Sequence, residues 1–559
     1  MQSHRLSWLI LVALILFSGR FFLSTQLFDT HDLEYHAART ANYYLALQQG
    51  QIPPRWSPNL NYSFGLPTFM FAYPLPYFAA TAFFLLVGSI QLSVNLALFS
   101  FWCIGSFGMF YYAKVRTEHN FYALLVALSY FAAPYSLLVF FERGAFGEAS
   151  FFALLPLVLL AIHWQNNIRS PWYLLGSYGI LLAFLLTHPQ SLVAAVPIVV
   201  GWTLLGYKKI ILLKYWRQKV FLLVSVCLSV QFFWIPLLLE AKQTYISEAI
   251  SSTRLLHSFP VFSRLFWPTV PAVQVIAGPM LITDFTTTLG VSLLLLLAGG
   301  IFVVTSKKRT ITQFFWLAII LLSIFFMHPA ASFFWAHVGS FKVIQFPWRL
   351  LSVSVFASSL LFIECLPVLS KHRTIRLAFL SLFFCVSLAN LVVWGKPKGY
   401  ISRSDYDWFE YFGTASSFDE FIPRGFDHEE NLRVTDKLAL STAGETIIDF
   451  WSGSRMLYRV TTDESTLVLQ KTAYFPGWKA YLNGNEHPII HDSPEYPGRI
   501  TLALPPGSHT VEVKFTNQTP IRQVADTTSV VGLGLLFIQV GSAVVWRRAS
   551  GTPAPHRSR

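Results

Sequence analysis

Charged residues are scarce in this chain of 559 residues: Asp, Glu, Lys and Arg make up only 12% of it, whereas soluble globular proteins carry roughly 25%. Hydrophobic residues make up 54%. So few charges could not cover the surface of a soluble globule of this size, which excludes an ordinary soluble enzyme. The composition instead indicates a membrane protein with several spans.

Cysteines and acidic residues are also few. The four cysteines all lie within apolar runs, which excludes a disulfide framework and a CxxC metal site. Asp and Glu number 28 against 41 for Lys and Arg, and the formal net charge is +13. The basic residues occur in short clusters between apolar runs, as membrane topology requires, so the charge does not indicate a nucleic-acid partner.

Long apolar runs are abundant. The run from Leu6 to Phe28 follows His4 and Arg5 and has no cleavage site of small residues, so we interpret it as an uncleaved signal anchor whose N-terminus is cytoplasmic. With it, the sequence predicts an all-α polytopic membrane protein of about twelve transmembrane helices. The further runs lie near residues 92–113, 120–140, 149–165, 171–187, 190–206, 220–239, 288–305, 311–327, 350–369, 375–394 and 526–546.

The segment from Tyr73 to Ile90 is apolar but interrupted by Pro74, Pro76 and Gly88. If it does not cross the membrane, the later basic clusters fall on the cytoplasmic side together with Arg5, as the positive-inside rule requires. We therefore predict a re-entrant or juxtamembrane helix, with both termini of the chain in the cytoplasm. The loops at 29–72, 141–149, 188–190, 240–287 and 328–349 then share the outer face.

The pattern changes at residue 395. Residues 1–394 are predicted to form the transmembrane domain, with a large first outer loop at 29–91. In residues 395–525 long apolar runs disappear, residues alternate as in Thr510–Phe515, and turn signals stand at Asn483-Gly484 and Pro505-Pro506-Gly507, which predicts a β-rich exocytoplasmic domain. A last helix at 526–546 and a cytoplasmic tail at 547–559 follow.

Candidate chemistry begins in the first outer loop. A helix that starts after Asp29 and ends near Gly50 would place Asp32, His36 and Arg39 on one face, at i, i+4 and i+7. Asp29 can be interpreted as the N-cap of this helix. An acid close to the bilayer needs a reason to be there, so we favour Asp32 as the functional acid, with Asp29 as its competitor.

The second outer loop carries Glu142, Arg143 and Glu148 between two apolar runs. These residues lie at the outer membrane edge, near the acids of the first loop. The alternative is that Glu142 and Arg143 mark the interface and Glu148 begins the next helix.

Two further loops add basic groups. His188 joins two spans and is either a helix cap or a site residue. Lys342 and Arg349 precede or begin a span, and Arg349 stands next to Trp348 at the level of the lipid head groups. A basic residue on the outer side goes against the positive-inside rule, so we favour phosphate binding by the forked donors of Arg349.

A metal site stays open. His31 and His36 are five residues apart, a spacing that does not place both on one helical face. Mg²⁺ or Mn²⁺ needs only one or two carboxylates together with a substrate phosphate, and Asp32 and Glu148 are the candidate ligands.

Several motifs together resemble the GT-C superfamily of membrane glycosyltransferases, and within it the bacterial membrane family labelled as 6-pyruvoyl-tetrahydropterin-synthase-related. They are HDLEYHAAR, GQIPPRWSPNLNYSFGLPTFMFAYPLPY, FERGAFGE, LLTHPQ and QFPWRLL, within residues 5–395. The family label implies no pterin chemistry, because the catalytic pattern of the soluble synthase is absent.

The resemblance implies an inverting transfer of a sugar from a polyprenyl-phosphate donor to an acceptor at the outer face of a bacterial cytoplasmic membrane. It makes Asp32 the counterpart of the first-loop catalytic acid, and Glu148 or Glu142 the second acid. Arg349, Arg143, Arg39, His36, His188 and Lys342 are the expected substrate- and phosphate-binding residues. No DxD pair is present, which leaves metal dependence open. The alternative is a non-catalytic scaffold or a transporter of lipid-linked glycans with the same fold.

Overall fold

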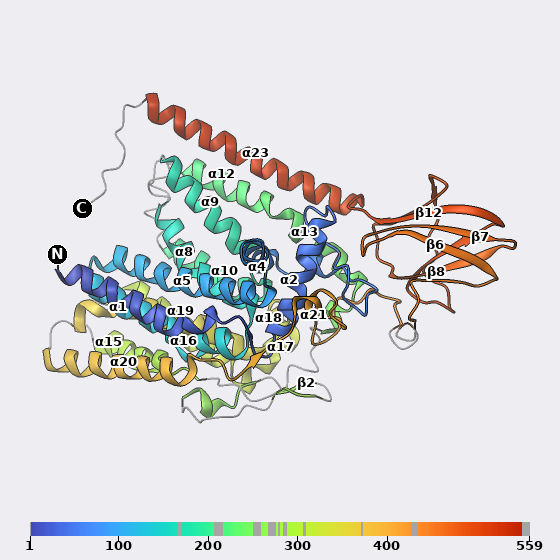
Figure 1. The fold of residues 1–559 in the computed structure, drawn as a ribbon. Helices are drawn as coiled ribbons and strands as arrows, with labels where there is room; N and C mark the ends of the chain where they lie inside the picture. Colours follow the sequence, from blue (N-terminus) through green and yellow to red (C-terminus); the bar gives the residue numbers. More distant parts are fainter. Residues whose placement is uncertain are drawn as a thin grey trace.

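The structure is a computed structural model, which describes residues 2–164, 170–205, 216–249, 259–266, 275–277, 280–282, 288–305, 309–369, 373–427, 431 and 434–549. Helices run side by side in one bundle, and a β sandwich projects from one end of it (Figure 1). Helix α1 begins and α23 ends at the opposite end of the bundle. The outermost residues of the predicted tail, 550–559, lie outside the described residues.

Each of the twelve predicted apolar runs contains a helix. Within the described residues, six helices are long and apolar enough to span a membrane, and the number is up to nine if each of three bent pairs is one span. The six lie in α1 (Gln2–Gly19), α5 (Ile90–Thr117), α8 (Phe146–Trp164), α19 (Leu351–Leu369), α20 (Arg373–Trp394) and α23 (Pro520–Ala549). The bent pairs involve α6 (Asn120–Phe131) with α7 (Pro134–Leu137), α12 (Trp216–Ser229) with α13 (Gln231–Glu240), and α16 (Ile311–Phe326) with α17 (Ser332–His337).

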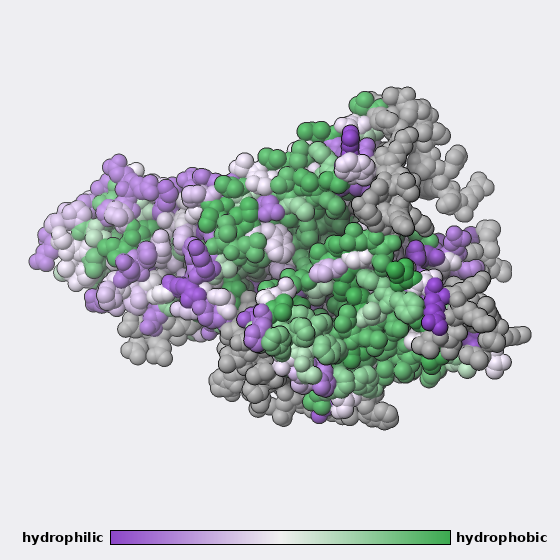
Figure 2. All heavy atoms as spheres, turned by 180° about the vertical axis from the view of Figure 1, so that it is seen from behind, coloured by the Kyte–Doolittle hydropathy of each residue, from purple (hydrophilic) through white to green (hydrophobic). Residues whose placement is uncertain are grey.

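Three further runs form shorter apolar helices, α9 (Pro171–Leu185), α10 (Pro189–Leu205) and α15 (Val291–Thr305). Apolar side chains cover much of the bundle surface, whereas the β sandwich is mostly polar (Figure 2). A lipid-facing bundle with a water-facing domain has this distribution, so the chain is a multi-pass membrane protein.

The proline-interrupted segment forms α4 (Pro74–Val87). Near its start, the Leu75 N–H donates to the Leu186 carbonyl at 3.3 Å, and just after its end the Ile90 N–H donates to Asp405 at 2.9 Å. Both contacts lie at the sandwich end of the bundle, and Figure 1 shows α4 nearly end-on where the long helices run across the view. The segment thus starts and finishes at one end of the bundle.

Two antiparallel sheets form the sandwich. One has the strand order β10-β9-β12-β7-β6 and the other β11-β8-β5. Alternate side chains point inward, and the Tyr458 hydroxyl donates to Gln470 Oε1 between the sheets at 3.4 Å. The strands are β5 (Leu438–Leu440), β6 (Gly444–Trp451), β7 (Arg455–Thr462), β8 (Thr466–Ala473), β9 (Trp478–Leu482), β10 (Asn485–His487), β11 (Arg499–Leu504) and β12 (Gly507–Phe515).

Residues 398–427, which we call the strap, belong to the predicted β-rich region but pack on the first loop instead. Strand β4 (Tyr400–Ile401) pairs with β1 (Leu27–Phe28), and the Asn61 N–H donates to the Gly413 carbonyl at 2.7 Å. Arg403 forms an ion pair with Glu34. The strap thus covers the loop that carries the candidate acid.

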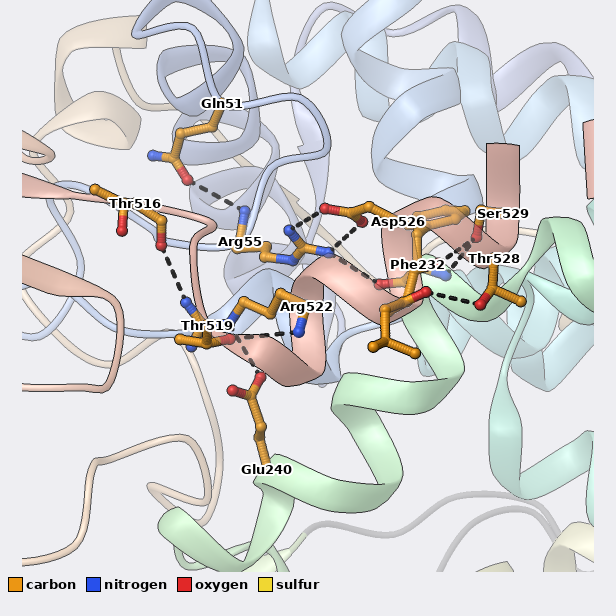
Figure 3. Close-up of polar contacts among 12 residues, drawn as sticks. Gln51, Arg55, Phe232, Glu240, Thr516, Thr519, Arg522, Asp526, Thr528 and Ser529 are labelled. Atoms are coloured by element: carbon orange, nitrogen blue, oxygen red, sulfur yellow. Dashed lines mark hydrogen bonds and ion pairs between the residues drawn. The ribbon is translucent and has the colours of Figure 1, made fainter. Parts of the chain in front are cut away.

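Charged residues buried between distant segments fix the last helix. Arg55 of the first loop makes a two-pronged ion pair with Asp526 of α23, with distances of 2.7 and 3.0 Å. Arg522 Nε donates to Glu240 of α13 at 3.1 Å, and both side chains are almost fully buried (Figure 3). Helix α23 begins at Pro520, six residues before the predicted start at 526, and Arg522 lies in this additional part.

The same region supplies hydrogen-bond partners for backbone groups at the bend between α12 and α13. The Phe232 N–H donates to Ser529 Oγ at 2.7 Å, and the Phe232 carbonyl accepts from Arg55 at 3.4 Å (Figure 3). A helix break at membrane depth is tolerated only where neighbouring protein groups replace the lost hydrogen bonds.

We expect Glu240→Gln to lower the free energy of unfolding by about 3–5 kcal/mol, because it leaves the Arg522 guanidinium buried and unpaired. The measurement is thermal or denaturant unfolding in detergent micelles, followed by tryptophan fluorescence. Glu248→Gln is the matched control, since Glu248 pairs with Arg424 at an exposed position. The double variant Glu240→Leu with Arg522→Met should regain most of the stability. An equal loss of stability in Glu240→Gln and Glu248→Gln would contradict the prediction.

Candidate functional site

The first-loop helix α2 (Leu33–Gln48) begins at Leu33, so Asp32 occupies the N-cap position and the interpretation of Asp29 as the N-cap is wrong. The Asp32 carboxylate makes no capping hydrogen bond, and Thr30 Oγ1 accepts from the Leu33 N–H at 3.2 Å. Asp32 Oδ2 instead lies 3.6 Å from Arg143 Nη2, and the Asp32 side chain is 30% exposed. Asp32 is therefore an accessible acid beside a guanidinium.

Arg143 connects this acid to a second one. Its Nη1 donates to Glu148 Oε2 at 2.6 Å, and the Tyr135 hydroxyl donates to Glu148 Oε1. Both carboxylate oxygens of Glu148 thus have a donor, and its side chain is 1% exposed. Glu148 is buried and fixes Arg143, whereas Asp32 is partly exposed and open on one side.

The backbone brings the two loops close together. The Asp32 N–H donates to the Arg143 carbonyl at 3.0 Å. Gly144 follows with φ of +61°, and a Cβ at this position would lie 2.3 Å from Leu33 Cγ. Only glycine allows this backbone conformation and this approach to α2 without strain.

The turn before α19 adds a second guanidinium. The Arg143 guanidinium carbon lies 4.5 Å from the centre of the Trp348 ring, and that of Arg349 lies 5.7 Å from it. Arg349 Nη1 donates to the Ile344 carbonyl at 2.9 Å and to Gln345 Oε1 at 3.0 Å. Arg349 Nε is buried without a partner, and within the described part of the chain no carboxylate is within ion-pair distance of it.

His36 and Arg39 share one hydroxyl on the next turns of α2. The Tyr77 hydroxyl lies 2.9 Å from His36 Nδ1 and accepts from Arg39 Nη1 at 3.3 Å. On its other side Arg39 Nη2 lies 4.0 Å from Glu420 of the strap. The predicted row of Asp32, His36 and Arg39 therefore faces one region, as its spacing indicated.

His188 joins this group through aromatic rings. Its ring lies 5.5 Å, edge to face, from that of Tyr73, which stacks on Tyr77 at 5.8 Å. His188 Nδ1 lies 2.8 Å from Ser191 Oγ. His188 contributes to the wall of the site.

Burial and positive charge keep the histidines neutral. Burial lowers the pKa of His36 well below its ordinary value, and Arg39 and Arg143 lower it further. Burial also lowers the pKa of His188, and Arg349 and Arg143 add to the shift. Although burial opposes it, Glu148 and then Asp32 raise the pKa of Arg143, which stays a cation.

Two predicted site residues are not part of this cluster. Glu142 forms an ion pair with Lys398 of the strap. Lys342 lies on α18 (Gly339–Ile344), and within the described residues its ammonium group has no hydrogen bond or ion pair. The sequence left open whether Glu148 or Glu142 is the second acid. In the structure Glu148 lies in the cluster and Glu142 does not.

Other contacts were not predicted from the sequence. The hydroxyls of Tyr77 and Tyr135 both hold site residues. Glu420 was also missed. An acid followed by an aromatic, as in Glu420-Phe421, carries no signal of its own, and Phe421 lies 5.1 Å from the Arg39 guanidinium.

The donor set does not fit a divalent cation. Asp32 and Glu148 both face the Arg143 guanidinium, and the two oxygens of Glu148 already accept hydrogen bonds. Among the described residues, three or more His, Cys, Asp or Glu side chains do not gather anywhere in an arrangement that could hold a metal ion. Binding of Mg²⁺ or Mn²⁺ would require Arg143 to move away, so we derive no step through a metal.

The chain belongs to the family of membrane proteins described as 6-pyruvoyl-tetrahydropterin synthase related domain, whose model matches residues 69–395, more than half of the chain. Arg143, Glu148, His188 and Arg349 lie inside the matched range, and Asp32 lies before it. No curated protein matches the chain.

The two acids should respond differently to neutralisation. Glu148→Gln removes a buried carboxylate and leaves Arg143 with one distant partner, so we expect a loss of about 3 kcal/mol in unfolding free energy. Asp32→Asn should change stability little, because Asp32 is partly exposed. Denaturant unfolding of both variants in micelles measures the difference, and a larger loss in Asp32→Asn would contradict the roles assigned here.

Stability should fall in mild acid. In the folded protein the pKa values of His36 and His188 are depressed, so below about pH 6.5 the unfolded chain binds more protons, and each histidine costs about 1.4 kcal/mol per pH unit until its folded pKa is reached. The unfolding midpoint measured from pH 7.5 to pH 5 should therefore drop. His188→Gln should flatten this dependence, whereas His337→Gln, at an exposed position, should leave it as in the wild type.

Proposed function

We propose that the protein is an integral membrane glycosyltransferase with a GT-C-like fold of about twelve spans. It moves a sugar from a polyprenyl-phosphate donor to an acceptor at the outer face of a bacterial cytoplasmic membrane, where the site, the strap and the β sandwich lie. The observation that carries the proposal is an accessible carboxylate, Asp32, beside two buried guanidiniums, Arg143 and Arg349.

Asp32 acts as the general base. Its carboxylate accepts the proton of an acceptor hydroxyl, whose oxygen forms a bond to the anomeric carbon of the donor sugar. The bond between that carbon and the phosphate oxygen breaks, and the polyprenyl phosphate leaves with the bonding electrons. Because the acceptor attacks from the side opposite the leaving group, the anomeric configuration inverts.

The arginines stabilise the charge that develops on the leaving phosphate. Arg349 has a buried Nε without a partner, so it has a donor available for a phosphate oxygen. The Arg143 guanidinium is held by Glu148 and needs no rearrangement during the reaction. Donors already fixed where charge appears are the most effective form of electrostatic catalysis.

His36 and His188 contribute uncharged polar groups to the site. Because their pKa values are depressed, they can accept or donate a hydrogen bond near neutral pH without adding charge. With Tyr73 and Tyr77 they form a packed aromatic cluster behind Asp32 and Arg39.

A transporter is less well supported. A transporter would hold a coupling ion at an acid deep within an apolar run, and Glu364 lies in such a run. In the structure Glu364 pairs with Arg116 at 2.8 Å, so its charge is already matched.

Asp32→Asn should reduce sugar transfer by about 10²- to 10⁴-fold, because the base is lost while the fold is kept. The assay uses protein in lipid nanodiscs, polyprenyl-linked sugars extracted from bacterial membranes, and a labelled sugar. Asp29→Asn, three residues earlier at an exposed position, is the matched control and should keep wild-type transfer. Undiminished transfer in Asp32→Asn would remove this residue from the mechanism. If the wild-type protein binds labelled polyprenyl phosphate but transfers no sugar, the result would favour a non-catalytic scaffold.

A further inference from the structure

A buried guanidinium in the sandwich has no anion to match it. Arg499, the first residue of β11, is only 3% exposed. Its Nε donates a long hydrogen bond of 3.4 Å to the Gln470 carbonyl, and its Nη2 is buried without a partner. Within the described part of the chain no carboxylate is within ion-pair distance of Arg499.

A second cation lies beside it. Lys471 follows Gln470 in β8 and is half-buried. Its Nζ lies 5.5 Å from the centre of the Phe64 ring, and the Arg499 guanidinium carbon lies 6.0 Å from the same ring. Burial lowers the pKa of Lys471 and the charge of Arg499 lowers it further, with Asp436 opposing the shift.

Among the buried arginines that the structure describes, Arg349 of the Asp32 cluster also lacks an ion pair, whereas others are matched. Arg522 and Arg143 each have a carboxylate at hydrogen-bond distance. A buried charge without a partner is strongly unfavourable, and a like charge next to it adds to the cost. Two cations held together in this way are characteristic of a site for an anion that the chain itself does not supply.

The place is a junction between domains. The Ala473 N–H donates to the Phe64 carbonyl of the first loop at 2.9 Å, and the Tyr474 N–H donates to the Gly498 carbonyl at 2.8 Å. Gly498 is in close contact with Phe426, the end of the strap. An anion bound to Lys471 and Arg499 would therefore lie where the sandwich, the first loop and the strap meet.

We propose that Arg499 and Lys471 form a second binding site, separate from the Asp32 cluster, for an oxyanion: a carboxylate or phosphate group. Lys471 is the member that faces the solvent, and Arg499 lies beneath it. Occupation of this site stabilises the attachment of the sandwich to the first loop. The proposal does not depend on the glycosyltransferase activity.

The test is thermal unfolding of the full chain in detergent micelles, titrated with phosphate or glucuronate at constant ionic strength, with chloride as the reference salt and glucose as the uncharged control. We expect either oxyanion, and not glucose, to raise the midpoint. The apparent affinity should fall about tenfold in Lys471→Gln, which loses one charged hydrogen bond, and the shift should vanish in Arg499→Gln. Whichever of phosphate and glucuronate raises the midpoint more indicates whether the site takes a phosphate or a carboxylate group.

A control variant and a stability comparison distinguish an anion site from a purely structural arginine. Lys479→Gln removes a lysine of β9 that pairs with Glu486, and it should keep the wild-type shift. In chloride alone Arg499→Gln should be at least as stable as the wild type, because an unmatched buried charge is gone; a purely structural arginine would give the opposite result. If Arg499→Gln does not fold, Lys471→Gln decides.

Three outcomes would overturn the proposal. One is a wild-type midpoint that neither oxyanion raises. A second is a shift of equal size in Lys471→Gln, Arg499→Gln and Lys479→Gln. Glu429 and Glu430 lie outside the described residues, so a double Gln variant of these two is included: oxyanion stabilisation that appears only in this variant would show that the chain provides its own anion and would also overturn the proposal.

Discussion

The guanidinium of Arg143 is the group on which the candidate site depends. It contacts Glu148 at 2.6 Å and Asp32 at 3.6 Å, so it joins the start of α8 to the start of α2. Trp348 covers its face and brings the turn before α19 to the same place. Because an unpaired buried charge is costly, the pairing of this one cation with Glu148 and Asp32 helps to hold the first loop on the bundle.

The same requirement explains which parts of the structure could be predicted from the sequence. Apolar runs and alternating residues are local patterns, and they predicted the helices and the sandwich. The spacing of Asp32, His36 and Arg39 is also local, and it predicted a shared face. Arg55 and Asp526 are 471 positions apart. No local pattern marks such a pair, because each partner is defined only by the fold that brings it near.

Acids in apolar surroundings show this limit most directly. Glu148 and Glu364 both stand in apolar surroundings, and the structure pairs them with Arg143 and Arg116. The sequence could not distinguish a carboxylate that is fully satisfied, such as Glu148, from one that is open on one side, such as Asp32. That distinction depends on Tyr135, whose hydroxyl occupies the second oxygen of Glu148.

The range of the family match adds a constraint on how the site is assembled. The match covers residues 69–395, and it therefore includes Arg143, Arg349 and Tyr77 but neither Asp32 nor Glu420. Arg143 and Arg349 come from the matched region, while Asp32 and Arg39 come from the segment before it and the strap from the segment after it. The preceding segment meets the matched region through Asp32 on Arg143 and Arg39 on Tyr77, and the strap meets it through Lys398 on Glu142. Membership of the family thus describes the part that holds Arg143 and Arg349, and the acid has to be argued from the geometry of α2 alone.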